Sequence, residues 1–152
     1  MTTDLVAGRL SVSALHLLHR AGQQAEDLFM RETGNAAVTP RQYAVLLAVS
    51  QNEDISQTGL VTATGIDRST LADVARRLVE KGYLQRKRTR TDARMYAVRL
   101  TAKGRDALAK TEPSAQRADE KILGTLTAKQ RNDFFSILGE IVTGLDRLAE
   151  AA

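Results

Sequence analysis

The segment 65–103 constrains the fold of this chain more than any other part of the sequence. Asp67 stands where a helix N-cap is needed, and Gly82 stands where that helix would end. Between them, apolar residues recur at the i, i+3, i+4, i+7 and i+8 spacing of one helical face, namely Leu71, Val74, Ala75, Leu78 and Val79. The sequence therefore predicts an amphipathic helix between Asp67 and Gly82.

This helix leads directly into a predicted β-hairpin. Strands are expected over 83–88 and 95–101, and the loop 89–94 joins them. Five basic residues cluster around that loop, namely Arg86, Lys87, Arg88, Arg90 and Arg94. A capped helix followed by a cationic hairpin is the layout of a winged helix–turn–helix, in which the helix fits the DNA major groove and the loop reaches the adjacent backbone and minor groove. We therefore expect a mainly α fold with a small β-hairpin wing.

The positive charge of the chain is concentrated in this same region. Residues 65–105 contain twelve lysines and arginines against four acidic residues, whereas the net charge of the whole chain is +4. The remainder of the chain is therefore net acidic. A solvated helix face can explain mixed charges, but segregation of this degree favours a surface that binds a polyanion such as nucleic acid.

Helices are also predicted before this segment. The sequence at 39–42 combines an N-cap threonine, a proline at the first helical position and a capping-box glutamine, so a helix is expected from there to about residue 50. Ser56 and Gly65 bound a short predicted helix over 57–64.

A long helix is predicted at each end of the chain. The first spans 6–31, and the last opens at a second capping box that begins with Thr127. Between the hairpin and this last helix, a helix restarts at Thr101 and contains Pro113. The last helix carries apolar residues at spacings of four and three, namely Phe134, Leu138, Ile141, Leu145 and Leu148. This pattern is typical of a helix that packs on another helix.

The chain offers few other elements to cover these terminal helices. Burial within the monomer is one solution, but pairing across a two-fold axis buries both helices more economically. We expect a homodimer built from a single domain over 1–152. Its DNA-binding lobe would span about 39–104, and its dimerisation helices about 5–32 and 105–150.

The face of the 67–82 helix opposite its apolar stripe supplies candidates for DNA contact. Ser69 and Thr70 lie near the helix N-terminus, where hydroxyl groups and the helix dipole suit phosphates or base edges. Arg76 and Arg77 are long enough to reach guanine edges or phosphates. Asp73 is repelled by phosphate, so it either accepts from a cytosine amino group or orients Arg76 or Arg77.

The hairpin loop supplies a second set of candidates. Asp92 lies two residues before Arg94 and can hold its guanidinium in a fixed direction through a charge-assisted pair. An ordered arginine at a hairpin tip suits the narrow minor groove, where the potential is most negative. Arg88 and Arg90 lie beside it and are further candidates. The alternative is a solvated hairpin with a weak salt bridge.

Other function classes lack support in the sequence. Without cysteine, disulfides and thiolate metal sites are excluded. There is no Gly-x-Ser-x-Gly elbow and no phosphate-binding glycine loop, so neither a catalytic residue nor a cofactor is expected. The longest apolar run, 44–49, is far shorter than the roughly 20 residues of a membrane span. We expect a non-enzymatic, cytoplasmic protein with no bound metal and no membrane association.

From residue 39 to residue 104 the chain closely resembles the MarR family of bacterial winged-helix transcription regulators. The matching segments are Thr-Pro-Arg-Gln-Tyr at 39–43, Gly-Ile-Asp-Arg-Ser-Thr-Leu at 65–71, Leu-Val-Glu-Lys-Gly-Tyr-Leu at 78–84, Asp-Ala-Arg at 92–94 and Leu-Thr-Ala-Lys-Gly at 100–104. The flanking helices match the family in length. The resemblance implies a triangular, mostly helical homodimer in which residues 69–77 enter the major groove and Arg94 enters the minor groove. Arg68, within the matching motif, joins these candidates.

The resemblance also implies a sensor. The family usually represses genes for aromatic degradation, efflux or stress, and releases DNA when a small anion or an oxidant binds. Sensing of an oxidant in this family depends on cysteine, which this chain lacks. The ligand would then occupy a cleft between the dimerisation helices and the DNA-binding lobe.

Four residues are candidates for that cleft. His16, His19 and Arg20 share one face of the first helix and could receive a carboxylate or phosphate, and Tyr43 would face the same cleft in this family. Alternatively, the first three are surface or interface residues and Tyr43 belongs to the core. We expect a repressor of a palindromic, inverted-repeat operator that is released by a small anionic effector, such as an aromatic acid or its acyl thioester. The alternative is an effector-independent architectural or nucleic-acid-binding protein.

Overall fold

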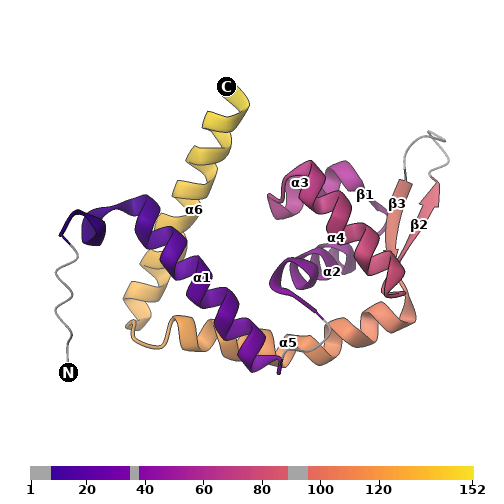
Figure 1. Cartoon of the computed structure of the whole chain (residues 1–152), viewed down its shortest axis with the longest axis horizontal. Coiled ribbons are helices and arrows are strands. Elements are labelled where there is room, and N and C mark those ends of the chain that lie inside the picture. The colour runs from indigo at the N-terminus through magenta and orange to yellow at the C-terminus, as the bar shows by residue number, and fades with distance from the viewer. Residues whose placement is uncertain (1–7, 35–37, 89–95) are drawn as a thin grey trace. The chain divides into compact units, whose positions relative to one another are not determined.

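The fold is mainly helical with one small antiparallel sheet (Figure 1). A computed structural model describes residues 8–34, 38–88 and 96–152. The elements are α1 (Ala14–Glu32), α2 (Pro40–Gln51), β1 (Ile55–Ser56), α3 (Gln57–Thr64), α4 (Arg68–Glu80), β2 (Leu84–Arg88), β3 (Tyr96–Leu100), α5 (Ala102–Ile122) and α6 (Ala128–Ala151). They fall into two compact units, Met1–Ala118 and Asp119–Ala152. The predicted fold class, mainly α with a small β wing, is confirmed.

Local capping signals place the starts of α2 and α6 where the sequence predicts them. At α2, Thr39 Oγ1 accepts from the backbone N–H of Gln42 at 3.2 Å, and Gln42 Oε1 accepts from the N–H of Thr39 at 3.1 Å. The same reciprocal pair joins Thr127 and Gln130 at the start of α6, at 3.2 and 2.9 Å. Each pair satisfies two N–H groups that a helix start leaves without a partner, which fixes the first residue of the helix.

The sheet contains one strand more than the predicted hairpin. Its order is β1-β3-β2, and β1 pairs with β3 so that Ile55 lies opposite Val98. The expectation of a hairpin alone was incomplete, because a strand of two residues shows no alternation that a sequence pattern could reveal. The pairing between β2 and β3 places Leu84 opposite Leu100 and Arg88 opposite Tyr96.

One apolar core holds the first unit together. Helices α2, α3 and α4 and strands β2 and β3 each contribute to it, and its largest side chains with at most 2% exposure are Val45, Leu46, Leu60, Leu71, Leu78, Leu84 and Val98. Two of them, Leu71 and Leu78, belong to the stripe predicted for α4. Burial of this stripe fixes the rotation of α4, so the opposite face of the helix must point to solvent.

The first helix begins later than predicted. A 3-10 helix covers Gly8–Val12, and Ser13, in extended conformation, caps α1 by accepting from the N–H of His16 at 3.2 Å. The predicted helix over 6–31 is therefore wrong in its first part, since apolar spacing alone cannot reveal a serine cap. Residues 6 and 7 lie outside the described residues.

The second unit consists of the end of α5 and all of α6. The predicted apolar seam of α6 faces solvent in the single chain, with Leu145 55% and Leu148 68% exposed. No helix that the structure describes is both long and apolar enough to cross a membrane.

Candidate nucleic-acid interface

Helix α4 starts on a strong cap. Asp67 Oδ2 accepts from the backbone N–H of Thr70 at 3.1 Å and from the hydroxyl of Ser69 at 2.9 Å. Hydrogen bonding lowers the pKa of Asp67 from 3.8 to about 2. The largest contribution comes from the Thr70 side chain, followed by the Thr70 N–H and the Ser69 hydroxyl. The hydroxyl proton of Ser69 is thus committed to Asp67, which leaves the Ser69 oxygen as an acceptor toward a bound molecule.

Asp67→Asn is expected to remove a pH-dependent part of the stability while keeping the cap, because asparagine caps about as well as aspartate. The charged form is favoured in the folded state, so its contribution is full above about pH 4 and is lost as the pH falls through about 2. Thermal melts of both proteins from about pH 2 to pH 7 check this. The difference in melting temperature should be constant near neutrality and should close near pH 2; a difference that persists there would contradict the assignment.

The solvent face of α4 carries a connected set of charges. Asp73 Oδ1 pairs with Arg76 Nη2 at 2.6 Å, and Asp73 Oδ2 pairs with Arg77 Nε at 2.9 Å. Glu80 Oε1 pairs with Arg76 Nη1 at 2.7 Å. The hydrogen bond from Arg76 is the main cause that lowers the pKa of Asp73, and the same bond raises the pKa of Arg76. The structure thus joins three predicted site residues and adds Glu80, which the sequence places on the same face but which was not among the predicted DNA contacts, although its i+4 spacing from Arg76 was a usable signal.

The described part of the hairpin adds a cationic strand beside α4 (Figure 1). Arg86, Lys87 and Arg88 on β2 are all exposed, and the guanidinium carbon of Arg88 lies 6.0 Å from the ring centroid of Tyr96 on β3. A cation over a ring face is held by the ring quadrupole, which limits the directions that Arg88 samples. The predicted contacts Arg90, Asp92 and Arg94 lie outside the described residues.

A bidentate ion pair links β3 to the turn before β1. Arg99 on β3 donates to both carboxylate oxygens of Asp54, and its Nη2 lies 2.7 Å from Asp54 Oδ2. This pair lowers the pKa of Asp54 and raises the pKa of Arg99. Asp54 has a positive φ of 55°, a conformation for which aspartate is among the more tolerant residues. The pair joins residues 45 positions apart, so no local pattern predicted it.

The predicted effector residues lie in the first unit. His16 is half-buried, whereas His19 and Arg20 are exposed on α1. Tyr43 on α2 is half-buried and contacts Phe29 of α1, with ring centroids 5.8 Å apart. Phe29 follows Arg20 by nine residues, about 14 Å along the helix axis. Tyr43 therefore meets α1 more than two turns away from the cluster on that helix.

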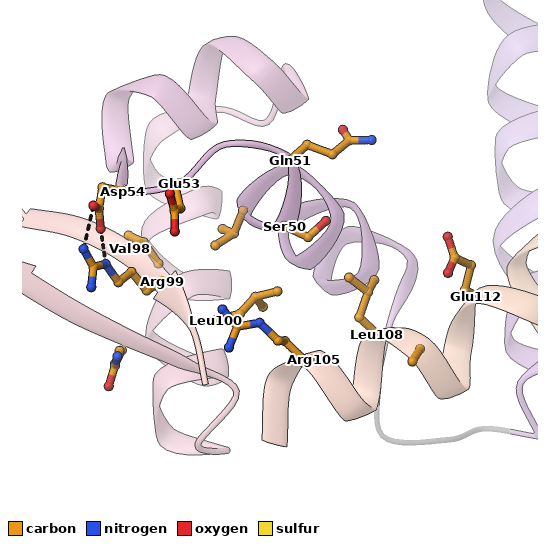
Figure 2. Close-up of a pocket in the computed structure, with 13 residues that line it drawn as sticks. Ser50, Gln51, Glu53, Asp54, Val98, Arg99, Leu100, Arg105, Leu108 and Glu112 are labelled. Carbon is orange, nitrogen blue, oxygen red and sulfur yellow. Dashed lines mark hydrogen bonds and ion pairs between the residues drawn. The ribbon is translucent and has the colours of Figure 1, made fainter. Parts of the chain in front are cut away.

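The first unit also contains a cavity that the sequence did not reveal (Figure 2). Its volume is about 730 Å³, and the end of α2, the turn before β1, the sheet and the first half of α5 form its walls. Arg105 and Leu108 of α5 line it together with Glu53, Asp54 and Arg99. None of the four predicted effector residues lines this cavity.

The described ranges contain no group of three or more histidine or carboxylate side chains placed to hold a metal ion.

The geometry of a capped helix beside a basic strand agrees with the comparison to known proteins. The model of the MarR family matches residues 38–95. The transcriptional regulator HosA of Escherichia coli is 30% identical over 131 residues, which cover 83% of this chain and 97% of HosA. The chain belongs to the MarR family.

Two solved structures of MarR-like regulators are similar to this chain over nearly its whole length. BpsR of Bordetella bronchiseptica, whose DNA binding is regulated by 6-hydroxynicotinic acid, is 28% identical with a TM-score of 0.82, covering 86% of this chain and 93% of BpsR. The transcriptional repressor CouR, solved on a 23-mer DNA duplex, is 29% identical with a TM-score of 0.82, covering 92% of this chain and 99% of CouR. The relatives are transcriptional regulators rather than enzymes.

The structure of this MarR-family chain explains part of the motif at 100–104. Thr101 Oγ1 donates to the carbonyl of Gly82 at 2.5 Å and accepts from the N–H of Gly104 at 3.0 Å. The backbone N–H of Thr101 donates to the carbonyl of Tyr83 at 3.1 Å. The threonine therefore links the turn after α4 to the start of α5, which fixes the position of the end of α4.

Proposed function

We propose that this MarR-family chain is a ligand-responsive repressor that binds an inverted-repeat operator as a homodimer. The observation that carries the proposal is the fixed solvent face of α4, which presents two arginines beside the exposed basic strand β2. That face would enter the major groove with Arg68, Ser69, Thr70, Asp73, Arg76 and Arg77. The basic hairpin, with Arg88, Arg90, Asp92 and Arg94, would follow the backbone and minor groove. The complex of CouR with a DNA duplex supports this class of ligand.

Exposed apolar side chains at both ends of the chain support the homodimer. Val12 before α1 and Leu15 on α1 are 82% and 81% exposed, and α6 adds Leu145 and Leu148. Large apolar side chains in such number mark an interaction surface on a protein of this size. A second copy of the same chain would cover both sets, with a DNA-binding lobe at about 39–104 and pairing helices at about 5–32 and 105–150 in each protomer.

The function is tested by footprinting on duplexes selected from a random library. A two-fold dimer should protect an inverted repeat whose half-sites lie about 10 bp apart, and its affinity should fall steeply with salt because each phosphate contact releases counterions. Protection of one asymmetric half-site would count against the dimer. Equal affinity for all duplexes would count against an operator-specific repressor.

For the effector we propose a small anionic aromatic acid or its thioester. The acid that regulates BpsR is of this chemical class. His16, His19 and Arg20 form a cluster on α1 that can donate charge-assisted hydrogen bonds to a carboxylate. Tyr43 contacts α1 more than two turns away, so its ring and hydroxyl could reach only a larger effector such as a thioester. To release DNA, the ligand must bind the dimer arrangement that cannot bind DNA more tightly than the arrangement that can. The difference in binding free energy must be several kcal/mol.

The double substitution His16→Ala with Arg20→Ala is expected to abolish release while operator affinity stays within about threefold of wild type. The measurement is fluorescence anisotropy of the selected duplex, titrated first with 6-hydroxynicotinic acid and then with other hydroxylated aromatic acids. Arg31→Ala, which removes an exposed arginine from the far end of the same helix, is the matched control and should release normally. A double variant that still responds like wild type would place the effector site elsewhere.

A further inference from the structure

The two arginines on the solvent face of α4 are held in different ways. Arg76 lies between two carboxylates, with Nη2 on Asp73 at 2.6 Å and Nη1 on Glu80 at 2.7 Å. Among the ion pairs of the described residues, Arg77 makes one, through Nε to Asp73 at 2.9 Å. Both terminal nitrogens of Arg76 are therefore engaged on its own helix. The hydrogen bonds of the described residues leave both terminal nitrogens of Arg77 available.

This difference matters because a guanidinium recognises guanine with a pair of donors. The common contact places two N–H groups of one arginine on O6 and N7 of the base. Arg77 can offer its two terminal nitrogens without breaking its bond to Asp73, and that bond restrains the direction of the side chain. Each terminal nitrogen of Arg76 keeps a second N–H, but Asp73 and Glu80 hold its guanidinium along the helix from both sides. Arg76 would have to leave at least one of these carboxylates before it could extend toward a base.

The charge balance of this face points the same way. Asp73 and Glu80 neutralise Arg76 and Arg77, so this part of α4 adds little net attraction to phosphate. Exposed pairs of this kind are weak in water, but a groove that excludes water strengthens them. Long-range attraction must then come from residues outside the cluster, including Arg68 at the start of α4 and the exposed cations of β2.

We infer that Asp73 and Glu80 are positioning residues that withhold Arg76 from the bases and present Arg77 as the arginine that selects one guanine in each half-site. The inference rests on the proposed function, since it assigns roles within the face that enters the major groove. It adds Glu80, which makes no contact with DNA in this scheme, as a determinant of base preference. Loss of Glu80 would free Arg76 to select a second base.

The experiment is a double-mutant cycle read as base preference. Wild type and variants are incubated with duplexes randomised over about 20 bp, and the bound fraction is sequenced. Affinities for the selected duplex and its single-base variants are then measured by anisotropy.

Arg77→Lys keeps the charge but loses the planar pair of donors, so preference for guanine should fall at least about fivefold at one position of each half-site. Glu80→Ala should create a preference at a second position. Arg76→Ala should remove that new preference and weaken binding at least about fivefold more in the Glu80→Ala background than in wild type.

The matched control is Asp106→Ala. Asp106 pairs with Lys110 at 2.9 Å on α5, also at i, i+4 spacing, so its removal changes the net charge by the same amount away from α4. It should alter affinity for all duplexes alike and create no base preference. The inference is wrong if Arg77→Lys leaves guanine preference unchanged, or if Arg76→Ala has equal effects in both backgrounds. A wild-type protein without any sequence preference would overturn the proposed function and this inference together, whereas the first two outcomes overturn the inference alone.

Discussion

Gly104→Ala is expected to lower the free energy of unfolding of the first unit by roughly 3 kcal/mol or more, which places it among the most damaging single substitutions. A Cβ at position 104 would lie 2.0 Å from the carbonyl oxygen of Tyr83, 2.9 Å from its carbonyl carbon and 3.1 Å from its Cα. All three are backbone atoms, so no side-chain rotation can relieve the overlap. Thermal and urea denaturation followed by circular dichroism measure the loss.

The reason for the damage lies in what the Tyr83 backbone does. Its carbonyl accepts from the N–H of Thr101, and the neighbouring carbonyl of Gly82 accepts from the Thr101 hydroxyl. Gly82 itself has a φ of +78°, so the turn has little freedom to move in response. Displacing Tyr83 would break both bonds and shift the end of α4, so operator affinity should fall together with stability.

Gly22→Ala is the control for the same chemical change. Gly22 lies inside α1, and an added Cβ would meet nothing within 4 Å. Alanine favours helix over glycine, so this variant should be unchanged or more stable by up to about 1 kcal/mol. If Gly104→Ala unfolded at the same denaturant concentration as Gly22→Ala, the close approach of α5 to the turn after α4 would be disproved.

Several features set by short sequence separations were predicted from the sequence, although the Ser13 cap of α1 was not. Thr39 with Gln42 and Thr127 with Gln130 interact three residues apart, so the residue types alone fix the helix starts. The buried stripe of α4 followed in the same way from its spacing, and it determines which face of the helix is free. These local signals located the candidate DNA-binding face before any tertiary contact was known.

Features that depend on distant partners were not predicted. Strand β1 exists because β3 pairs with it, and the pair of Asp54 with Arg99 depends on that same pairing. The cavity of Figure 2 brings the end of α2 and the turn after it together with β3 and α5, which follow tens of residues later in the chain. Its walls and the role of Gly104 follow from the packing of α5, which no periodicity in the sequence describes.

Ion pairs within one helix were predicted only in part. Spacing alone allowed Asp73 to orient either Arg76 or Arg77, and the structure has it pair with both. Which nitrogen of each arginine is engaged could not be derived from spacing, because it depends on the rotamers of four neighbouring side chains. That detail is what distinguishes Arg77 from Arg76 as the arginine free to contact a base.

The double substitution Ile141→Glu with Leu145→Glu is expected to turn the dimer that we propose into a monomer and to weaken operator binding at least about 100-fold. Both side chains lie on the apolar seam of α6 and are 39% and 55% exposed in the single chain. Two carboxylates at the centre of an apolar interface would lose their hydration without gaining partners, which strongly opposes association. A monomer contacts one half-site only, so its affinity should approach the non-specific level.

The matched control places the same charges on the opposite face of the same helix. Asn132 and Ser136 precede Ile141 and Leu145 by nine residues each, which is a rotation of about 180° at 100° per residue. Asn132→Glu with Ser136→Glu should therefore remain dimeric and bind the operator. Sedimentation equilibrium gives the oligomeric state, and anisotropy of the selected duplex gives the affinity. If the seam variant stayed dimeric with wild-type affinity, α6 would not pair the protomers, and the exposed apolar side chains of the 3-10 helix and α1 would have to form the interface without it.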